Sequence, residues 1–586
     1  MVIKFFNKIQ FNNSLVFELS CFLVVIIAQL VLGIFIQQFG FFNAGHDLRR
    51  FAIVLSIMPV AAIYSVLRFV LPPLVSALLV TSIISILSIV NFVKTSLTTI
   101  PLSYGDIVNT DNMSIVGHYI TPVQILLIIG FLIIIALAFA LNPYKKPASY
   151  VLLFQVLCLL VALPLSFKPY INKIDKAIGS QFDLYFTKAG SRYVSWSWSA
   201  NVAENGLPIH LVQTSVSNIP SVPNAAEKQA FNKLLIGDSK TSAIQRPNRI
   251  IMILCEGCWN DAKHFMAPFS KLTELGFKPL RAVSPSYGGN TVNASFEVHT
   301  GLPAKGVLSG VIYTEYAELL SDHIYSIEQS LKLNGYKNTV QQNNSKMFYK
   351  SNVVKPKLGF DEFISRENMA QGSAVSAADE WPKDDILFKS ALKTLAEKNT
   401  HQFLFLITLY THGDFKSLND NGETDYYTRL KQSIGDIADF AKQAISEDPD
   451  TLIFLFGDHK PALTKFFYDK NIIPKAQFSL AAKSIDLSNA NQGFLFAENA
   501  STAIIGDVPA YIYHQDTAKV DDFIQRANNK PLFCVSAALN ESFLKVKLPA
   551  FEYAKQNHIC EDYTAEGYKA TVDKYPGWLY SLSLFK

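Results

Sequence analysis

Three apolar stretches, "RIIMILCE" (249–256), "FLFLITLYTHGDF" (403–415) and "TLIFLFGDHKP" (451–461), share one feature. Each begins as a run of aliphatic and aromatic residues typical of a buried strand, and each ends in a carboxylate or an imidazole. In open α/β sheets, functional sites form just beyond the carboxyl ends of the strands. The pattern therefore predicts an α/β domain whose site is built from Glu256, His412, Asp458 and His459.

The chain before this domain is far more apolar. Four segments are long enough to span a bilayer and a fifth is slightly shorter: 14–39, 51–71, 74–93, 123–141 and 150–167. The first segment has no small-residue cleavage site close behind it, so we interpret it as an uncleaved helix. Only 17% of the 586 residues are charged, which is also typical of a membrane protein. We expect residues 1–170 to form a transmembrane domain of about five helices.

Charge placement suggests an orientation. Lysines at 4, 8, 145 and 146 lie on the cytoplasmic side if the N-terminus is cytoplasmic, whereas Arg49, Arg50 and Lys94 oppose that bias. Five spans then place the rest of the chain outside the cytoplasm. We expect residues 171–245 to be an amphipathic connector and linker, and residues 246–586 to be an extracytoplasmic catalytic domain. The net charge of +4 and the absence of zinc-finger spacing disfavour a nucleic-acid partner.

The strand-end residues suggest a metal site. Glu256, Asp458 and His459 offer two carboxylates and one imidazole, a mixed oxygen and nitrogen set suited to Mn²⁺, Mg²⁺ or Zn²⁺. The Gly-Asp-His turn at 457–459 allows two adjacent side chains to reach one ion.

A threonine is the candidate nucleophile. In "GGNTVNASFEVHTGLP" (288–303), Thr291 follows a glycine pair and precedes a helix-like run. A hydroxyl placed on a metal ion loses its proton more easily, and a helix start favours an anionic substrate. The alternative is that Thr291 only caps this helix.

The cysteines leave two questions open. Cys534 and Cys560 could pair in an oxidising compartment. Cys255 and Cys258 form a CxxC, which indicates either a redox or zinc site or a buried, disulfide-linked pair. No second CxxC and no thioredoxin-like context support the redox or zinc interpretation.

Four motifs follow one another along the chain: "IIMILCEGCW", "GGNTVNASFEVHTGLP", "LYTHGDF" and "FLFGDHKPAL". In this order, behind five membrane spans, the chain resembles the lipoteichoic acid synthase and phosphoglycerol transferase family of the alkaline phosphatase and sulfatase superfamily. The segment "NFVKTSLTTIPLSYGDI" (91–107) is also similar to that family. The resemblance implies a sulfatase- or alkaline-phosphatase-like α/β domain with a mostly parallel central sheet.

The resemblance also implies roles for residues. It gives one divalent ion, Mn²⁺ ahead of Mg²⁺ or Zn²⁺, bound by Glu256, Thr291, Asp458 and His459, with Thr291 as nucleophile and His412 as a catalytic residue. The segment "EWPKDDILFKSAL" (380–392) matches one that lines the family's site, where Trp381 and Asp384 are candidates beside a packing or capping role. The substrate-binding candidates are His412, Trp381, Gln342, Tyr349 and Asn290.

Two departures bear on specificity. In "VQQNNSKMFYKSN" (340–352), Gln342 replaces the family's histidine, and Tyr349-Lys350-Ser351 replace its Trp-x-Arg, so we expect the head-group pocket to differ from the family's. No Cys-x-Pro-x-Arg surrounds any cysteine, which disfavours a true sulfatase.

The expected activity is transfer of phosphoglycerol from phosphatidylglycerol to a glycan or polymer hydroxyl through a phosphothreonine. The alternatives are a phosphoethanolamine transferase, hydrolysis in place of transfer, and a catalytically silent scaffold. We expect a bacterial inner-membrane protein whose catalytic domain faces the periplasm or exterior.

Overall fold

The fold comes from a computed structural model. It describes residues 15–35, 50–98, 101–104, 107, 149–166, 201–202, 205–215, 220–236, 246–308, 310–317, 319–346, 348–369, 381–397, 401–413, 415–416, 420–478, 496–497, 499–563 and 567–585. The chain divides into two compact units, residues 1–217 and 218–586. Each unit is described by itself.

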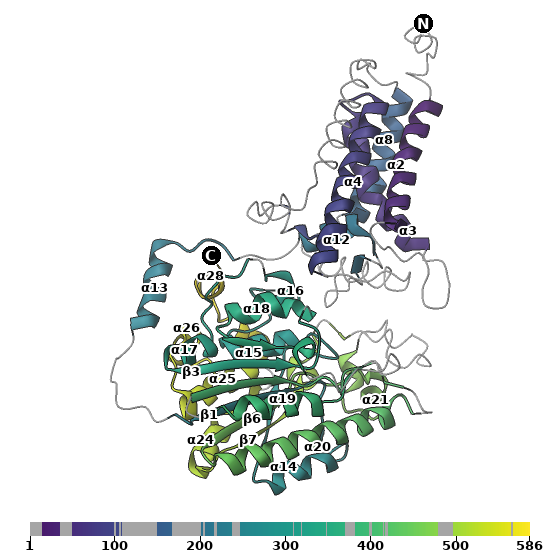
Figure 1. The fold of residues 1–586 in the computed structure, drawn as a ribbon. Coiled ribbons are helices and arrows are strands. Elements are labelled where there is room, and N and C mark those ends of the chain that lie inside the picture. The colour runs from purple at the N-terminus through teal and green to yellow at the C-terminus, as the bar shows by residue number, and fades with distance from the viewer. Residues whose placement is uncertain are drawn as a thin grey trace. The chain divides into compact units, whose positions relative to one another are not determined.

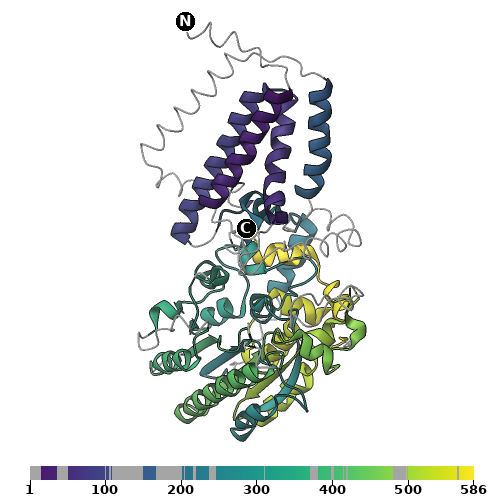
Figure 2. The ribbon, with the colours of Figure 1, turned by 90° about the vertical axis from the view of Figure 1, so that its right-hand side faces the viewer.

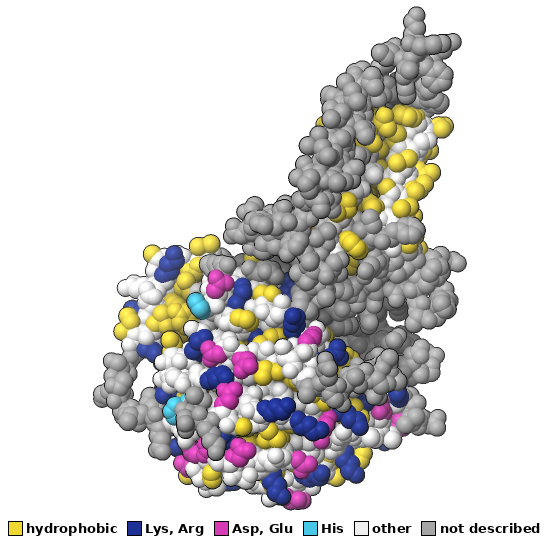
Figure 3. Space-filling view, viewed as in Figure 1, with side chains coloured by type: hydrophobic (Ala, Val, Ile, Leu, Met, Phe, Trp, Pro, Cys, Tyr) yellow, Lys and Arg dark blue, Asp and Glu magenta, His cyan; other side chains and the backbone are white. Residues whose placement is uncertain are grey.

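The first unit is helical. Its elements are α2 (Leu15–Phe35), α3 (Arg50–Arg68), α4 (Pro73–Thr98), α8 (Ser149–Ser166) and the short α12 (Leu207–Thr214). Helix α2 packs on α3 and α4, and α3 packs on α8 (Figures 1 and 2). Many of their large apolar side chains face outward, among them Val16 and Leu160 with 69% and 66% of their surface exposed. The visible described face of this unit is correspondingly apolar (Figure 3).

Two described helices are long and apolar enough to cross a membrane, over Val16–Ile34 in α2 and Pro73–Phe92 in α4. Helices α3 and α8 contain shorter apolar stretches, Ser56–Arg68 and Val151–Ala162. The predicted span at 123–141 lies outside the described residues. The complete set of five spans therefore stays a prediction.

A buried polar cluster ties three of these helices together. Glu18 of α2 pairs with Arg68 of α3 at 2.7 Å, and accepts hydrogen bonds from Tyr64 and from Gln155 of α8. A buried charge is tolerated where it is paired and hydrogen-bonded, so this cluster fixes the packing of the helices.

The described residues of the second unit form an eight-stranded sheet, in the order β4-β3-β5-β1-β6-β7-β2-β8. The strands are β1 (Arg249–Cys255), β2 (Lys278–Val283), β3 (Tyr336–Gln342), β4 (Glu362–Ile364), β5 (His401–Ile407), β6 (Thr451–Gly457), β7 (Asp507–Tyr513) and β8 (Lys530–Pro531). Only β7 runs antiparallel to its neighbours among the described pairings. The predicted mostly parallel α/β sheet is thus confirmed.

Helices cover both faces of this sheet (Figure 1). They are α13 (Ala225–Ile236), α14 (Ser270–Glu274), α15 (Thr291–Thr300), α16 (Ile312–Glu315), α17 (Ile327–Leu333), α18 (Ser351–Lys357), α19 (Asp385–Leu395), α20 (Glu423–Glu447), α21 (Thr464–Asp469), α23 (Thr502–Ile505), α24 (Thr517–Ala527), α25 (Leu532–Leu539), α26 (Pro549–Gln556), α27 (Tyr568–Val572) and α28 (Gly577–Leu584).

Strand β1 shows why its sequence is continuously apolar. Ile250, Met252 and Leu254 face one core, shared with α15, α24 and α25. Ile251 and Ile253 face a second core, shared with α14, α19 and α20. A strand buried on both faces has no polar alternation, as is typical of parallel sheets covered by helices.

The second unit contains two disulfides, Cys255–Cys258 and Cys534–Cys560. The structure therefore favours the disulfide-linked interpretation of the CxxC over a zinc site, which would require free thiolates.

Removing the Cys534–Cys560 bond is expected to destabilise the second unit by about 3 kcal/mol, since the bond closes a loop between residues 26 apart. The Cys534→Ser/Cys560→Ser variant of the full chain should unfold at lower urea concentration, followed by near-ultraviolet circular dichroism in detergent. Cys158→Ser removes a free cysteine and is the control. Equal midpoints for the double variant and the wild type would contradict the prediction.

Candidate active site

The site lies at the carboxyl ends of three neighbouring parallel strands, β5, β1 and β6. Cys255 pairs in register with Gly457, so the residues that follow them, Glu256 and Asp458, emerge side by side. A Cβ at Gly457 would come within 2.5 Å of the Cys258 carbonyl oxygen, so glycine permits this close approach of the two strand ends. The predicted convergence of strand-end residues is therefore present in the tertiary structure.

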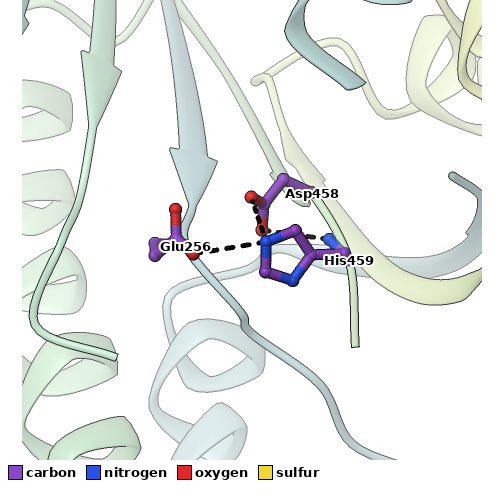
Figure 4. A group of neighbouring side chains, drawn as sticks. All are labelled: Glu256, Asp458 and His459. Carbon is purple, nitrogen blue, oxygen red and sulfur yellow. Dashed lines mark hydrogen bonds and ion pairs between the residues drawn. The ribbon is translucent and has the colours of Figure 1, made fainter. Parts of the chain in front are cut away.

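Glu256, Asp458 and His459 form a compact buried cluster (Figure 4). One potential ligand atom from each lies within 4.8 Å of the others. His459 Nε2 is 3.3 Å from Glu256 Oε1 and 3.1 Å from Asp458 Oδ2, yet Nε2 and Oδ2 are buried without a hydrogen bond to any described residue. Buried polar atoms are almost always hydrogen-bonded, so these two fit the role of metal ligands.

The rest of the cluster is held by backbone contacts. Asp458 Oδ1 accepts hydrogen bonds from the Gly257 and His459 amides at 2.8 and 3.0 Å. His459 Nδ1 donates to the Lys460 carbonyl oxygen at 2.9 Å, which leaves Nε2 as the nitrogen for an ion. These contacts leave Asp458 Oδ2 and His459 Nε2 oriented toward the same point, where an ion would bind.

The carboxylates of Glu256 and Asp458 lie close together in a buried site, so their negative charges repel each other. Burial and the negative charge of Glu256 raise the pKa of Asp458 to about 7. Burial opposes ionisation of Glu256 as well, but electrostatic interactions with the His412 and His459 imidazoles and hydrogen bonds from His459 and Thr291 lower its pKa to about 2. A bound divalent cation would offset this repulsion and allow both carboxylates to ionise.

Thr291 is brought directly to this cluster. It is the first residue of α15, and its Oγ1 donates to Glu256 Oε2 at 2.9 Å. The N-cap is Asn290, in the left-handed region with φ 62°, and no side chain caps the helix. The structure thus contradicts the interpretation of Thr291 as a helix cap. Gly289 has φ +151° with nothing within 4 Å of a Cβ, so its role is a backbone conformation that side-chain-bearing residues rarely adopt.

His412 and Trp381 form a second group. Their ring centroids are 4.1 Å apart. His412 Nδ1 donates to the Gly413 carbonyl oxygen at 2.6 Å, so Nε2 is the nitrogen available for proton transfer. Trp381 Nε1 is buried without a hydrogen-bond partner, which is compatible with a contact to substrate.

A cavity of about 30 Å³ adjoins Thr291 and Glu256. Gln342 and Tyr349, both predicted from the sequence, line it. Gln342 donates to the Ser345 carbonyl oxygen at 2.8 Å, and burial raises the pKa of Tyr349, so its hydroxyl stays protonated. Asn290 does not line this cavity, but its buried Oδ1 lacks a hydrogen-bond partner.

Asp384 is a positioning residue for the site. It lies at the N-cap of α19 without capping the helix, and is fully buried. Its carboxylate accepts hydrogen bonds from the Leu409 and Tyr410 amides, Asn343 and Ser433. Asp384 thereby ties α20 to the loop that leads from β5 to His412.

Sequence reasoning missed three residues near the cluster. Thr408 Oγ1 accepts from the Glu256 amide at 2.9 Å, and Thr411 donates to the Glu256 carbonyl oxygen. Lys355 lines the cavity from α18. The threonines lie within the "LITLYTHGDF" stretch and could have been suspected from it, whereas nothing local to Lys355 indicates its position.

Comparisons with known proteins find a family match for part of the chain. Residues 270–487 match the Sulfatase family. The match includes Thr291, His412, Asp458 and His459, while Glu256 precedes it. A Rhizobium meliloti protein named "Putative cyclic beta-1,2-glucan modification protein" is 25% identical over 301 residues, covering 47% of this chain and 45% of its own length. The chain thus spans less than half of that relative.

Several solved structures are similar to part of this chain. The Streptococcus pyogenes phosphoglycerol transferase GacH, in complex with sn-glycerol-1-phosphate, is 15% identical with a TM-score of 0.42, over 63% of this chain and 95% of that chain. The lipoteichoic acid synthase LtaP from Listeria monocytogenes is 16% identical with a TM-score of 0.38, over 55% and 80%. The periplasmic domain of EcEptC from Escherichia coli, in complex with Zn, is 12% identical with a TM-score of 0.33, over 51% and 82%.

The family match covers Thr291 and the Asp458-His459 pair, in agreement with the resemblance drawn from the sequence. Residues 270–487 of this chain, somewhat more than a third of its length, match the Sulfatase family model.

Proposed function

We propose that this protein is a membrane-bound phosphoglycerol transferase. It moves the head group of phosphatidylglycerol to a hydroxyl of a glycan or polymer, through a phosphothreonine at Thr291. The observation that carries the proposal is the Thr291 hydroxyl, buried 2.9 Å from a carboxylate of a metal-competent cluster at the ends of two strands, β1 and β6. An activated hydroxyl in this position is suited to attack phosphorus.

The reaction has two balanced displacements. Thr291 Oγ1 gives up its proton and forms a bond to phosphorus, the bond from phosphorus to the diacylglycerol oxygen breaks, and that oxygen takes up a proton. The acceptor hydroxyl then attacks the same phosphorus, and Thr291 regains its proton as the bond to it breaks. His412 Nε2 accepts the proton of the attacking hydroxyl.

A divalent ion held by Glu256, Asp458, His459 and Thr291, Mn²⁺ ahead of Mg²⁺ or Zn²⁺, would lower the pKa of the threonine hydroxyl and offset the negative charge on the phosphate. The N-terminal amides of α15 favour the same anionic group. Trp381, packed on His412, is positioned to contact the substrate near the proton acceptor.

Several observations support a membrane-bound transferase in an oxidising compartment, with a glycan as its acceptor. The matched residues 270–487 contain no cysteine that a sulfatase could convert to its catalytic aldehyde. The apolar helices α2 and α4 are suited to holding the enzyme beside a lipid donor. The disulfides favour an oxidising compartment such as the periplasm. The glucan-modifying name of the Rhizobium relative supports a glycan acceptor.

The test is incubation of the full chain with Mn²⁺ and head-group-labelled phospholipids, followed by mass analysis of the Thr291 peptide. Phosphatidylglycerol should yield diacylglycerol and a peptide heavier by about 154 Da, the mass of glycerol phosphate less one water. Consumption of phosphatidylethanolamine instead would support the phosphoethanolamine alternative. An adduct on another residue, or none with any phospholipid, would overturn the proposal.

A further inference from the structure

Helix α18 presents a buried lysine to the cavity beside Thr291. Lys355 is 3% exposed and lines the same cavity as Thr291 and Glu256. Ser351, one turn earlier on α18, also lines it, so both side chains lie on one face of the helix. Helices α18 and α15 share the same hydrophobic core on one face of the sheet.

The surroundings of the Lys355 ammonium are aromatic. Its Nζ lies 5.2 Å from the ring centroid of Phe405 and 5.8 Å from those of Tyr313 and Phe360. Among the residues that the structure describes, none forms a hydrogen bond or an ion pair within 4 Å with this Nζ. Aromatic faces attract a cation, but they do not replace the hydrogen bonds that an ammonium loses on leaving water.

Glu328 is the carboxylate that acts on this charge, and its Oε2 is buried with no hydrogen-bond partner among the described residues. Glu328 Oε1 is 2.6 Å from His299 Nδ1, with both side chains fully buried. Burial lowers the pKa of Lys355 to about 8 and Glu328 opposes that change, so the side chain is mostly charged at neutral pH. The fold thus keeps a positive charge that no anion within the described part of the second unit satisfies directly.

The polar residues in the rest of the cavity wall are mostly uncharged. They are amides and hydroxyls, including Gln342, Asn343, Asn344 and Ser351. Glu256, a member of the metal-competent cluster, is the one carboxylate among the described lining residues. Such a wall suits an uncharged polyol and an anionic oxygen, and is unfavourable for an ammonium group that would meet a second ammonium there.

We propose that Lys355 determines head-group specificity: its ammonium binds an anionic oxygen of the phosphate ester in this cavity and disfavours head groups that carry their own ammonium. This inference rests on the proposed function for the identity of the substrate. The anion-binding role of Lys355 can be tested without turnover.

The first experiment measures binding. Full-length wild type, Lys355→Met and Lys355→Arg are titrated with glycerol phosphate and with inorganic phosphate in the presence of Mn²⁺, and the melting temperature is recorded. We expect wild type and Lys355→Arg to be stabilised, and Lys355→Met to need at least about tenfold more of either anion. The melting temperature of Lys355→Met without anion should be unchanged or higher, because an unpaired buried charge has been removed.

Lys357→Met is the matched control. Lys357 lies on the same helix but donates to the carbonyl oxygens of Ala317 and Leu320, and it is absent from the cavity lining. Its loss should leave anion affinity at the wild-type level. Equal anion affinity in Lys355→Met and wild type would overturn the inference, as would a weakening of the same size in Lys357→Met.

The second experiment measures selectivity. Head-group release from phosphatidylglycerol and from phosphatidylethanolamine is compared in mixed micelles, and the ratio of the two kcat/KM values should fall at least about tenfold in Lys355→Met. Lys355→Arg should retain the wild-type ratio. An unchanged ratio in Lys355→Met, with an active wild type, would refute the inference while the proposed function stands. An inactive wild type whose anion affinity depends on Lys355 would refute the proposed function while the anion site stands.

Discussion

Thr291→Ala is expected to abolish head-group transfer, with a loss of kcat on the order of 10⁴-fold or more, as for removal of a covalent nucleophile. The hydroxyl that donates to Glu256 is then absent, so no phosphothreonine can form. The measurement is diacylglycerol release from labelled phosphatidylglycerol by the full chain, together with the mass of the peptide that contains position 291. Both the release and the adduct should disappear.

Two comparisons make this prediction specific. Thr291→Ser retains a hydroxyl at the same position and should recover part of the activity and an adduct on serine. Binding of Mn²⁺ to Thr291→Ala should persist, because Glu256, Asp458 and His459 remain in their cluster. Unchanged lipid turnover by Thr291→Ala would contradict the nucleophile assignment and leave a scaffold or a different mechanism.

The second large effect concerns the metal-competent cluster. Glu256→Gln removes one of two carboxylates and should lower turnover by at least about 10³-fold, because charge stabilisation at phosphorus depends on the bound ion. Wild type should be stabilised by Mn²⁺ by about 2.7 kcal/mol at an ion concentration of 100 times the Kd. Thermal unfolding with and without Mn²⁺ measures this effect, and Glu256→Gln should lose most of it.

Asp261→Asn is the matched control for that variant. Asp261 lies five residues after Glu256 and contacts His264, but it is outside the cluster. Its replacement should preserve both turnover and stabilisation by Mn²⁺. Stabilisation of Glu256→Gln equal to that of wild type would show that the ion binds elsewhere.

The strands of the site could be predicted because their sequence requires a particular environment. The run from Ile250 to Leu254 is apolar at every position, which is stable in water only when both faces of a strand are covered. Parallel strands bring their carboxyl ends to one edge of the sheet, so Glu256 and Asp458 had to emerge together once the strands were neighbours.

The helix boundaries and interhelical contacts of the membrane part could not be predicted in the same way. Hydropathy reports whether a segment can lie in lipid, but it does not fix where a helix begins and ends. Helix α3 runs from Arg50 to Arg68, whereas the hydropathy of the sequence places the span at 51–71, so the two differ in where the helix ends. The pairing of Glu18 with Arg68 was also invisible, because it joins residues of different helices.

The role of Thr291 could not be assigned by sequence alone. A threonine at a helix start is an ordinary cap, and the stretch "GGNT" is compatible with that interpretation. The structure gives the N-cap position to Asn290 and directs the Thr291 hydroxyl to Glu256. This choice depends on a residue 35 positions earlier in the chain, so no local pattern contains it.

The sequence by itself determined the α/β fold, the strands that carry Glu256, Asp458 and His459, and the residue types that can bind an ion, because periodicity and side-chain chemistry are local properties. Only the tertiary structure decided that the Cys255–Cys258 pair is a disulfide, that Asp384 holds the loop leading to His412, and that Lys355 reaches the cavity. These are contacts between elements far apart in the chain. They depend on how the helices pack on the sheet, which fixes the distances between side chains to within an ångström and leaves no periodic signal in the sequence.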